Sequence, residues 1–143
     1  MQPFDRLLVP VDFSDITPSV IATARRLLAP EGRAILLHVV ETLPLVTEGT
    51  LGVYAHRRDI EEIKRLSLDR LKQLIAEYRD PRLVPEVREG KPAPEILAVA
   101  QAQRSEVIVM GTQGRSRMEH LLVGSVTERV LRRATCSVFT VRP

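Results

Sequence analysis

Glycine and serine residues in the last third of the chain have a spacing that could bind phosphate. Gly111 and Gly114 directly follow the apolar run 107–110, and the pair Gly124-Ser125 comes after nine intervening residues. Four consecutive apolar residues are typical of a strand buried on both faces. Glycine allows positive φ and close approach of the backbone to a ligand, and a helix N-terminus directs N–H groups and its positive dipole end at one point. This stretch therefore predicts a loop whose main-chain N–H groups surround a phosphate.

The spacing excludes two better-known phosphate loops. A P-loop requires G-x-x-x-x-G-K-[ST], but the three lysines are Lys64, Lys72 and Lys91, and Lys91 is followed by Pro92. The dinucleotide fingerprint G-x-G-x-x-G is absent as well. The pattern that is present reads G-x2-G-x9-G-S.

Each of these residues also has a purely structural interpretation. Ser125 and Glu128 form S-x-x-E, a capping box that could serve only to start a helix. Gly111 and Gly114 could simply form a turn after a strand. A turn alone does not require a second glycine-serine pair further on, so the full spacing favours phosphate binding. The two roles are also compatible, because both use the N–H groups at the start of a helix.

The composition narrows the class of ligand. A chain of 143 residues is long enough for one domain with a buried core, which we expect over residues 1–143. Aromatic residues make up only 3%, which argues against a platform for single-stranded nucleic acid because such platforms need stacking rings. A basic bias in the final third favours an anionic small molecule, whereas duplex DNA would need a larger basic face. The residues concerned are Arg115, Arg117, Arg129, Arg132 and Arg133, against Glu119 and Glu128.

Features of membrane or secreted proteins are missing from the sequence. The chain has one cysteine, so no disulfide can form within it. No apolar stretch approaches the length of a membrane span, and the N-terminus lacks the apolar segment of a signal peptide. We therefore expect a cytoplasmic protein.

Short apolar runs alternate with longer amphipathic segments, which predicts strands separated by helices. The first run contains Pro10, and the third contains Pro85, which is typical of an edge strand. His38 lies within the second run and is interpreted as a core residue. Strands are expected at residues 6–11, 34–40, 83–89, 107–110 and 137–141.

Helix signals follow each of the first four runs. Thr17 is expected as the N-cap of the first helix, with Pro18 at its first helical position and Pro30 and Gly32 ending it. The periodic pattern of apolar residues is absent over 41–56, which predicts a long loop. The next helix has one apolar face, made of Ile60, Ile63, Leu71, Leu74, Ile75 and Tyr78. The last two helices are expected after Pro94 and from about Val126 to Arg133.

Strands connected by helices predict a parallel sheet with helices on both faces. Ligands of such sheets bind beyond the carboxyl ends of the strands. Asp12 stands at the end of the first strand and Gly111 at the end of the fourth. Both would face one crevice if these strands were neighbours. Asp12 could instead cap the turn that follows it.

These motifs together resemble those of a known protein family. The pattern G-x2-G-x9-G-S, continued by 126–130, is similar to the nucleotide-binding signature of the universal stress protein family in its ATP-binding branch. Residues 9–14 resemble the family's first-strand motif, 37–41 its second-strand end and 89–93 its third-strand exit. The resemblance covers nearly the whole chain. It departs from the pattern at Arg117 and Glu119, where the family usually has a glycine and a small residue, and this bears on nucleotide preference.

The resemblance implies a fold, a ligand and a set of site residues. The fold would be Rossmann-like α/β, with five parallel strands in the order 3-2-1-4-5. The ligand would be ATP, or alternatively ADP or AMP, with Mg²⁺ carried on the phosphates; no catalytic residue and no metal ligand is predicted in the chain. Asp12 and Val39 would hold the adenine, and Pro10 and Val11 would line the base and ribose. The ribose and phosphates would be wrapped by Met110, Gly111, Gly114, Arg115, Gly124, Ser125 and Val126.

Three functions remain open at this stage. The first is a nucleotide-binding regulatory protein that acts in a stress response. The second is a slow ATPase or an enzyme that phosphorylates itself through Ser125 or a neighbouring hydroxyl, with His120 as the one obvious general base near the loop. The third is a module for a protein partner whose site has lost its nucleotide, which the presence of every glycine of the motif disfavours.

The last strand predicts a homodimer. Val138, Phe139 and Val141 are apolar, and Arg142 is the only charged residue from Ser137 onward. In the expected order this strand lies at an edge, where unpaired N–H and C=O groups invite pairing. Pairing with its own copy about a two-fold axis would satisfy them, and the family resemblance points the same way.

Overall fold

The computed structural model describes residues 2–42, 50–113 and 123–143, with the side chains of 50–56 excepted. All strand pairings in it are parallel, and they form one five-stranded sheet in the order β3-β2-β1-β4-β5, as predicted. The strands are β1 (Phe4–Pro10), β2 (Leu28–Glu41), β3 (Leu83–Gly90), β4 (Val107–Gly111) and β5 (Ser137–Val141). The helices are α1 (Thr17–Leu27), α2 (Thr50–Tyr78), α3 (Pro92–Ala102) and α4 (Ser125–Arg133).

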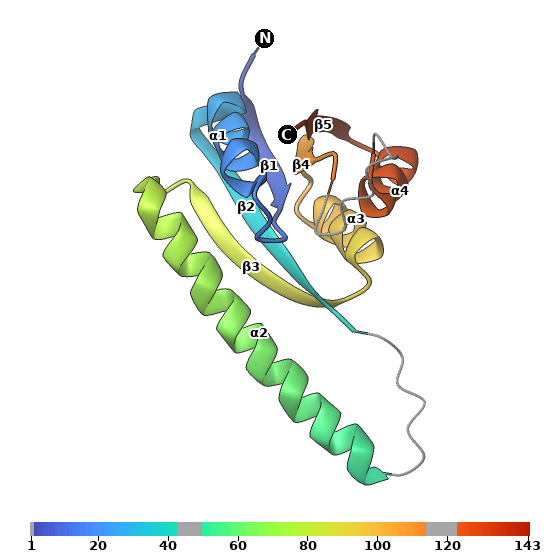
Figure 1. The fold of residues 1–143 in the computed structure, drawn as a ribbon. Coiled ribbons are helices and arrows are strands. Elements are labelled where there is room, and N and C mark those ends of the chain that lie inside the picture. Colours follow the sequence, from blue (N-terminus) through green and yellow to red (C-terminus); the bar gives the residue numbers. More distant parts are fainter. Residues whose placement is uncertain (1, 43–49, 114–122) are drawn as a thin grey trace.

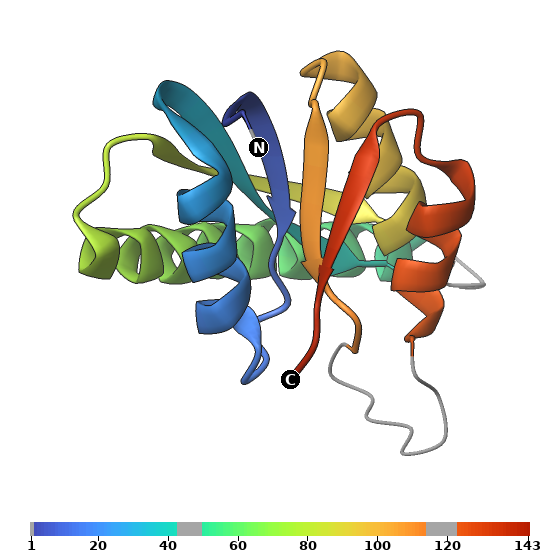
Figure 2. The same ribbon diagram turned by 90° about the horizontal axis from the view of Figure 1, so that it is seen from above.

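Helices cover both faces of the sheet, which confirms the predicted layers (Figures 1 and 2). Successive side chains of a strand point to opposite faces, so Leu7 and Val9 of β1 belong to one buried cluster and Leu8 to the other. The first cluster includes residues of α1 and α2, and the second includes residues of α3 and α4. Both faces of the central strands are therefore buried, in agreement with their uninterrupted apolar runs.

The start of α1 differs from the prediction. Its N-cap is Ile16, which makes no side-chain cap hydrogen bond, so Thr17 is the first helical residue and Pro18 the second. The Thr17 N–H donates to the Ser14 carbonyl at 3.0 Å. The turn before the helix thus supplies a main-chain acceptor, and no hydroxyl cap is needed.

β1 spans Phe4–Pro10 instead of the predicted 6–11, and the boundaries of β2 and α2 differ by more. β2 begins at Leu28, six residues early, because residues 28–33 stay extended beside β1 with an irregular register. Gly32 permits this close approach, since a Cβ there would lie 2.9 Å from the Phe4 carbonyl oxygen. α2 begins at Thr50, inside the predicted loop, and continues through Gly52. A glycine inside a helix costs only about 1 kcal/mol, which a helix of 29 residues can offset.

No helix in the described part of the chain is long and apolar enough to cross a membrane. α2 is long, but charged residues recur along it. Its side chains are tied to β3 by Glu89, whose carboxylate accepts hydrogen bonds from the Arg57 guanidinium at 2.7 and 2.8 Å and lies 3.3 Å from the Lys64 ammonium. This surface ion-pair group connects α2 to the carboxyl end of β3.

Candidate functional site

A cleft of about 770 Å³ opens beyond the carboxyl ends of β1, β2 and β4. It lies where β1 and β4 are neighbours while their connections run to opposite faces, which is the usual place for a ligand in this kind of sheet. Gly114 and Arg115, two of the predicted site residues, lie outside the described residues. The other nine all line this cleft: Pro10, Val11, Asp12, Val39, Met110, Gly111, Gly124, Ser125 and Val126.

The exit of β1 is fixed by hydrogen bonds to β2. The Val11 N–H donates to the Leu37 carbonyl at 2.8 Å, and Nδ1 of His38 lies 2.7 Å from the Val11 carbonyl oxygen. Because a carbonyl only accepts, His38 donates through Nδ1. Both main-chain groups of Val11 are therefore hydrogen-bonded within the fold, and Val11 lines the cleft.

Asp12 caps the turn that follows it, as the structural interpretation of this residue predicted. Its Oδ1 accepts a hydrogen bond from the Ser14 N–H at 3.0 Å. Asp12 also lines the cleft, and a carboxylate has acceptor sites for more than one donor. Capping therefore orients the Asp12 carboxylate without excluding a role in binding.

Phe13, the next residue, holds this turn in a strained conformation. Its φ of 59° lies in the left-handed region, which is a genuine outlier for a bulky side chain. The Phe13 ring packs between the Arg70 guanidinium of α2, 4.2 Å from the ring centroid, and the His38 ring of β2, at a centroid distance of 4.7 Å. These contacts hold the Phe13 ring beside the turn that contains Asp12.

Hydrogen bonds attach the start of α4 to the end of β4. The Gly124 N–H donates to the Thr112 carbonyl at 2.6 Å, and the Thr127 hydroxyl donates to the Gly111 carbonyl at 2.8 Å. Thr127 is buried, and the Thr112 N–H in turn bonds the Val141 carbonyl of β5 at 2.9 Å. The first turn of α4 is thereby held against one side of the cleft.

The predicted capping box does not form. α4 begins at Ser125, one residue before the predicted start, so Ser125 is helical and its neighbour Gly124 is the N-cap without a side-chain cap bond. The Glu128 carboxylate pairs with Arg132 at 2.8 Å instead of reaching back to the N-cap. The first N–H groups of a helix have no intrahelical acceptor, and Ser125 and Val126 carry theirs at the cleft.

Neither of the two described glycines of the motif, Gly111 and Gly124, has a positive φ. The one described glycine with positive φ is Gly90, at 135°. Gly124 has φ −70° and ψ 162°, which any residue can adopt. At Gly111 a Cβ would lie 3.0 Å from Cγ2 of Ile16. Of the two properties of glycine, positive φ and close approach, the structure therefore uses close approach at Gly111 and does not use positive φ at Gly111 or Gly124.

Not all basic residues in the final third of the chain lie near the cleft. Arg132 and Arg133 lie in the last turn of α4, at the opposite end of the helix from the cleft, where cations complement the helix dipole. Arg129 is exposed beside a smaller hollow that adjoins the cleft. Arg115, Arg117, Glu119 and His120 lie outside the described residues.

Other residues that the motif pattern does not reveal also line the cleft, among them His38, Ile63 and Ser67. His38, interpreted as a core residue, is half-buried and lines the cleft. Ile63 was placed on the buried face of its helix, but it is 47% exposed and lines the cleft with Ser67. Their only sequence signal is position: His38 is near the end of a strand, and the α2 residues lie on a helix that crosses that end. Among the described residues, no group of three His, Cys, Asp or Glu side chains could hold a metal ion.

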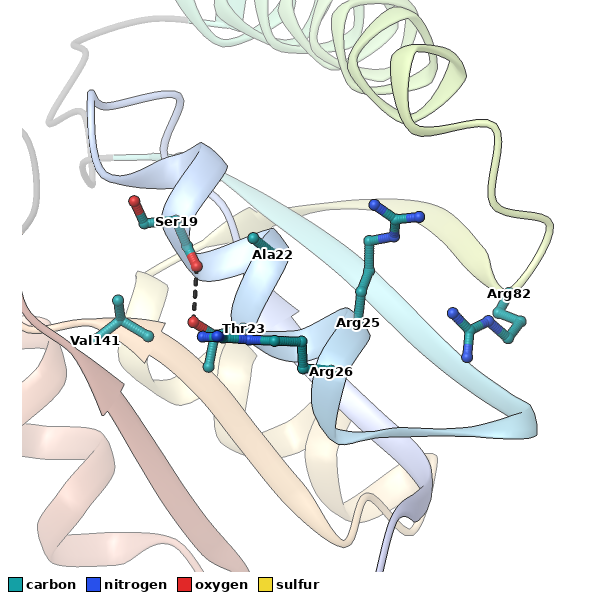
Figure 3. Close-up of a pocket in the computed structure, with 7 residues that line it drawn as sticks. All are labelled: Ser19, Ala22, Thr23, Arg25, Arg26, Arg82 and Val141. Carbon is teal, nitrogen blue, oxygen red and sulfur yellow. Dashed lines mark hydrogen bonds between the residues drawn. The ribbon is translucent and has the colours of Figure 1, made fainter.

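A second, broad hollow lies beside α1 (Figure 3). Arg25 and Arg82, which line it, are both engaged with the buried Asp80: Nε of Arg25 is 2.9 Å from Oδ2, and Nη2 of Arg82 is 2.7 Å from the same oxygen. The arginines here complete an internal ion-pair cluster, and we assign the hollow to the scaffold.

Known proteins resemble this chain over almost its entire length. The relatives include universal stress protein YxiE of Bacillus subtilis, 32% identical over 97% of this chain and 99% of its own. Universal stress protein MJ0531 of Methanocaldococcus jannaschii is 29% identical over 97% of this chain and 82% of its own. Among solved structures, UspA from Lactobacillus plantarum is 27% identical with a TM-score of 0.77, covering 99% of this chain and 100% of its own.

The fold is shared with a more distant structure as well. Protein MJ0577 of Methanocaldococcus jannaschii superimposes with a TM-score of 0.81 at 22% identity, over 98% of this chain and 96% of its own. The model of the universal stress protein family matches residues 3–142. With that match across the parallel sheet, the Asp12 turn and the α4 start, the chain belongs to the universal stress protein family.

Proposed function

We propose that the cleft binds an adenine nucleotide, foremost ATP, and that the protein is a nucleotide-binding regulator in a stress response. The observation that carries this proposal is the first turn of α4, held against β4 by Gly124 and Thr127, opposite the oriented carboxylate of Asp12. The cleft has a volume of about 770 Å³, and small-molecule sites typically have about 300–1,000 Å³.

The base and the phosphates would occupy opposite ends of this cleft. The Asp12 carboxylate would accept a hydrogen bond from the adenine amino group, between the side chains of Val11 and Val39. The main-chain N–H groups of Ser125 and Val126 and the Ser125 hydroxyl would donate to phosphate oxygens. Our proposal assigns the remaining phosphate contacts to Gly114 and Arg115. Pro10, Met110, Gly111 and Gly124 would line the ribose and the phosphate path.

Mg²⁺ would be carried by the phosphates, with water completing its coordination shell, as is common for this ion. It would supply positive charge that offsets the charge of the triphosphate. Asp12 and Glu41 are the carboxylates among the described lining residues.

The ligand can be tested on the purified protein. We expect mass spectrometry of the denatured protein to release a co-purified adenine nucleotide. Calorimetric titration of the nucleotide-free protein should show binding of ATP, ADP and AMP. GTP should bind more weakly, because guanine has an accepting carbonyl oxygen at the ring position where adenine has the amino group that would donate to Asp12. One relative of the same fold is described in complex with cAMP, so cAMP belongs in the same series.

Magnesium provides the control for this experiment. Mg²⁺ alone should give no measurable heat, whereas ATP binding should differ with and without it. A nucleotide-free protein that binds none of these compounds at millimolar concentration would refute the proposed function.

We further propose a homodimer through the open edge of β5. Among the described residues, β5 pairs with β4 alone, and the Val141 carbonyl accepts from the Thr112 N–H. Alternate residues of a parallel strand turn both main-chain groups to the same side, so Thr140 directs its N–H and C=O to the open edge. Phe139, the neighbour of Val109 in the register, is 40% exposed. Strand pairing with a second copy would satisfy the edge and cover apolar surface.

Thr140→Pro should shift the protein toward monomer. Proline removes the outward N–H without removing a hydrogen bond to β4, so the fold is expected to persist. Thr140→Val, which keeps the N–H, is the matched control and should stay dimeric. Sedimentation velocity at micromolar concentration measures the outcome. A monomeric wild-type protein, or a proline variant that sediments like the wild type, would contradict this interface.

A further inference from the structure

A smaller hollow of about 240 Å³ adjoins the cleft at the first turn of α4. Ser125, Val126, Glu41 and Pro92 line both spaces, so the hollow and the cleft share a wall. A phosphate chain that starts on the first turn of α4 would therefore have the hollow as its direct continuation.

Two cations meet at this hollow because α3 and α4 pack together on one face of the sheet. Both helices begin at the carboxyl ends of strands. Lys91 is the N-cap of α3, and its carbonyl accepts from the Glu95 N–H at 3.1 Å, which fixes its backbone. Arg129 lies four residues after Ser125 and hence on the same side of α4. Lys91 and Arg129 both line the hollow.

Lys91 and Arg129 are cations without a neutralising carboxylate in the described part of the chain. Among the described residues, no carboxylate lies within ion-pair distance of either side chain. Glu128, next to Arg129 in the chain, is paired with Arg132. Glu41 is the one carboxylate in the described lining of the hollow, which leaves an excess of one positive charge there.

On the side of the hollow formed by α3, a ligand would meet side-chain hydrogen-bond donors more than main-chain N–H groups. Pro92 and Pro94 have no N–H, so two of the first three positions of α3 offer no donor to a ligand. An anion that enters the hollow would therefore be recognised on this side by the Lys91 ammonium, and on the other side by the Arg129 guanidinium.

We propose that Lys91 and Arg129 bind the terminal phosphates of the nucleotide and make the site prefer nucleoside triphosphates over monophosphates. This inference rests on the proposed function. AMP has a single phosphate, which the first turn of α4 would hold, and it would leave the hollow without an anion. Each additional phosphate adds negative charge beside the two cations that line the hollow, so the contribution of Lys91 and Arg129 grows from AMP to ATP.

Single and double substitutions test this preference against a control on the same helix. We expect Arg129→Gln and Lys91→Gln each to weaken ATP binding about five- to tenfold, as loss of one charge-assisted contact would. AMP binding should change less than about twofold. Arg132→Gln removes the same charge from the far end of α4 and should leave both affinities unchanged. Calorimetry at fixed Mg²⁺ and fixed salt measures the ratio of ATP to AMP affinity.

The outcomes separate this inference from the function on which it rests. A reduced ratio in both single variants, and a further reduction in the double variant, would support the role of the two cations. An unchanged ratio in the double variant would overturn it while leaving the nucleotide site in place. An equal effect of Arg132→Gln would also overturn it, because general surface charge would then explain the loss. A wild-type protein that binds neither ATP nor AMP would refute the proposed function itself.

Discussion

Replacing Gly124 by valine is expected to weaken ATP binding by about a hundredfold. Gly124 has φ −70° and ψ 162°, and these angles are also comfortable for a β-branched residue. Its N–H can still donate to the Thr112 carbonyl. The added methyl groups would, however, stand at the entrance to the first turn of α4, where a phosphate must come close to the N–H groups of Ser125 and Val126.

The effect of this substitution on the fold should be small and separately measurable. Valine is a poorer N-cap than glycine, so we expect the free energy of unfolding to fall by no more than about 1 kcal/mol. Gly124→Ala adds a single carbon and should lie between the wild type and Gly124→Val in ATP affinity. Titration calorimetry gives the affinities and thermal unfolding checks the fold. A valine variant with wild-type ATP affinity would show that phosphate does not approach Gly124.

The fold could be predicted because its signals are local and repeated. Each central strand is an apolar run, and an apolar run is buried on both faces only when helices cover both sides of a parallel sheet. The predicted helix caps were wrong where main-chain groups make the hydrogen bonds that side chains were expected to make. At the start of α1 the N-cap Ile16 has no polar side chain, and the Ser14 carbonyl accepts the hydrogen bond from the Thr17 N–H. Ser125 caps nothing because α4 begins at Ser125 itself.

The cleft could be predicted in part for a similar reason. Asp12, Gly111 and Gly124 stand at ends of regular elements, and ends are visible as breaks in the apolar pattern. His38 and Ile63 could not be identified in this way, because they interrupt no pattern. Their place in the cleft depends on how β2 and α2 lie relative to β1, and that is decided by contacts between residues far apart in the chain.

The role of the glycines at the cleft also could not be predicted from the sequence alone. A glycine in a sequence indicates either a left-handed backbone or lack of space for a side chain. Gly111 belongs to the second kind, since a Cβ would press against Ile16 of the segment that precedes α1. This contact joins β4 to the Asp12 turn, the two sides of the site that the sequence identifies separately.

Asp80, remote from the cleft, is expected to carry the largest contribution of any single ionic group to stability. Its side chain is 5% exposed and lies between the guanidinium groups of Arg25 and Arg82. Arg82 donates to both carboxylate oxygens and also to the Ala29 carbonyl at 3.1 Å. The cluster joins the C-terminal part of α1, the start of β2 and the turn before β3.

Asp80→Asn should lower the free energy of unfolding by about 2–3 kcal/mol. The substitution keeps the shape but leaves two partly buried arginines without a counter-charge. Asp69→Asn is the control, because Asp69 lies 3.6 Å from Arg65 in a pair whose side chains are 54% and 61% exposed, and such pairs contribute less than about 1 kcal/mol. Urea denaturation at pH 7 compares the three proteins. Equal stability of Asp80→Asn and the wild type would contradict this role.

The same cluster should make stability depend on pH at the acid end. The hydrogen bond from Arg82, followed by that from Arg25, holds the pKa of Asp80 well below its usual range. The unfolded chain then binds a proton at Asp80 near pH 4, where the folded protein does not, so the free energy of unfolding falls as the pH is lowered below about 4.

The pH dependence should be weaker in Asp80→Asn. Asparagine does not ionise, so the free energy of unfolding should decrease less between about pH 4 and pH 2 in this variant than in the wild type. Because the difference between the two proteins comes from this one carboxylate, it should be constant above about pH 5 and shrink as the pH falls. A difference that stayed constant down to pH 2 would show that Asp80 contributes through shape and not through charge.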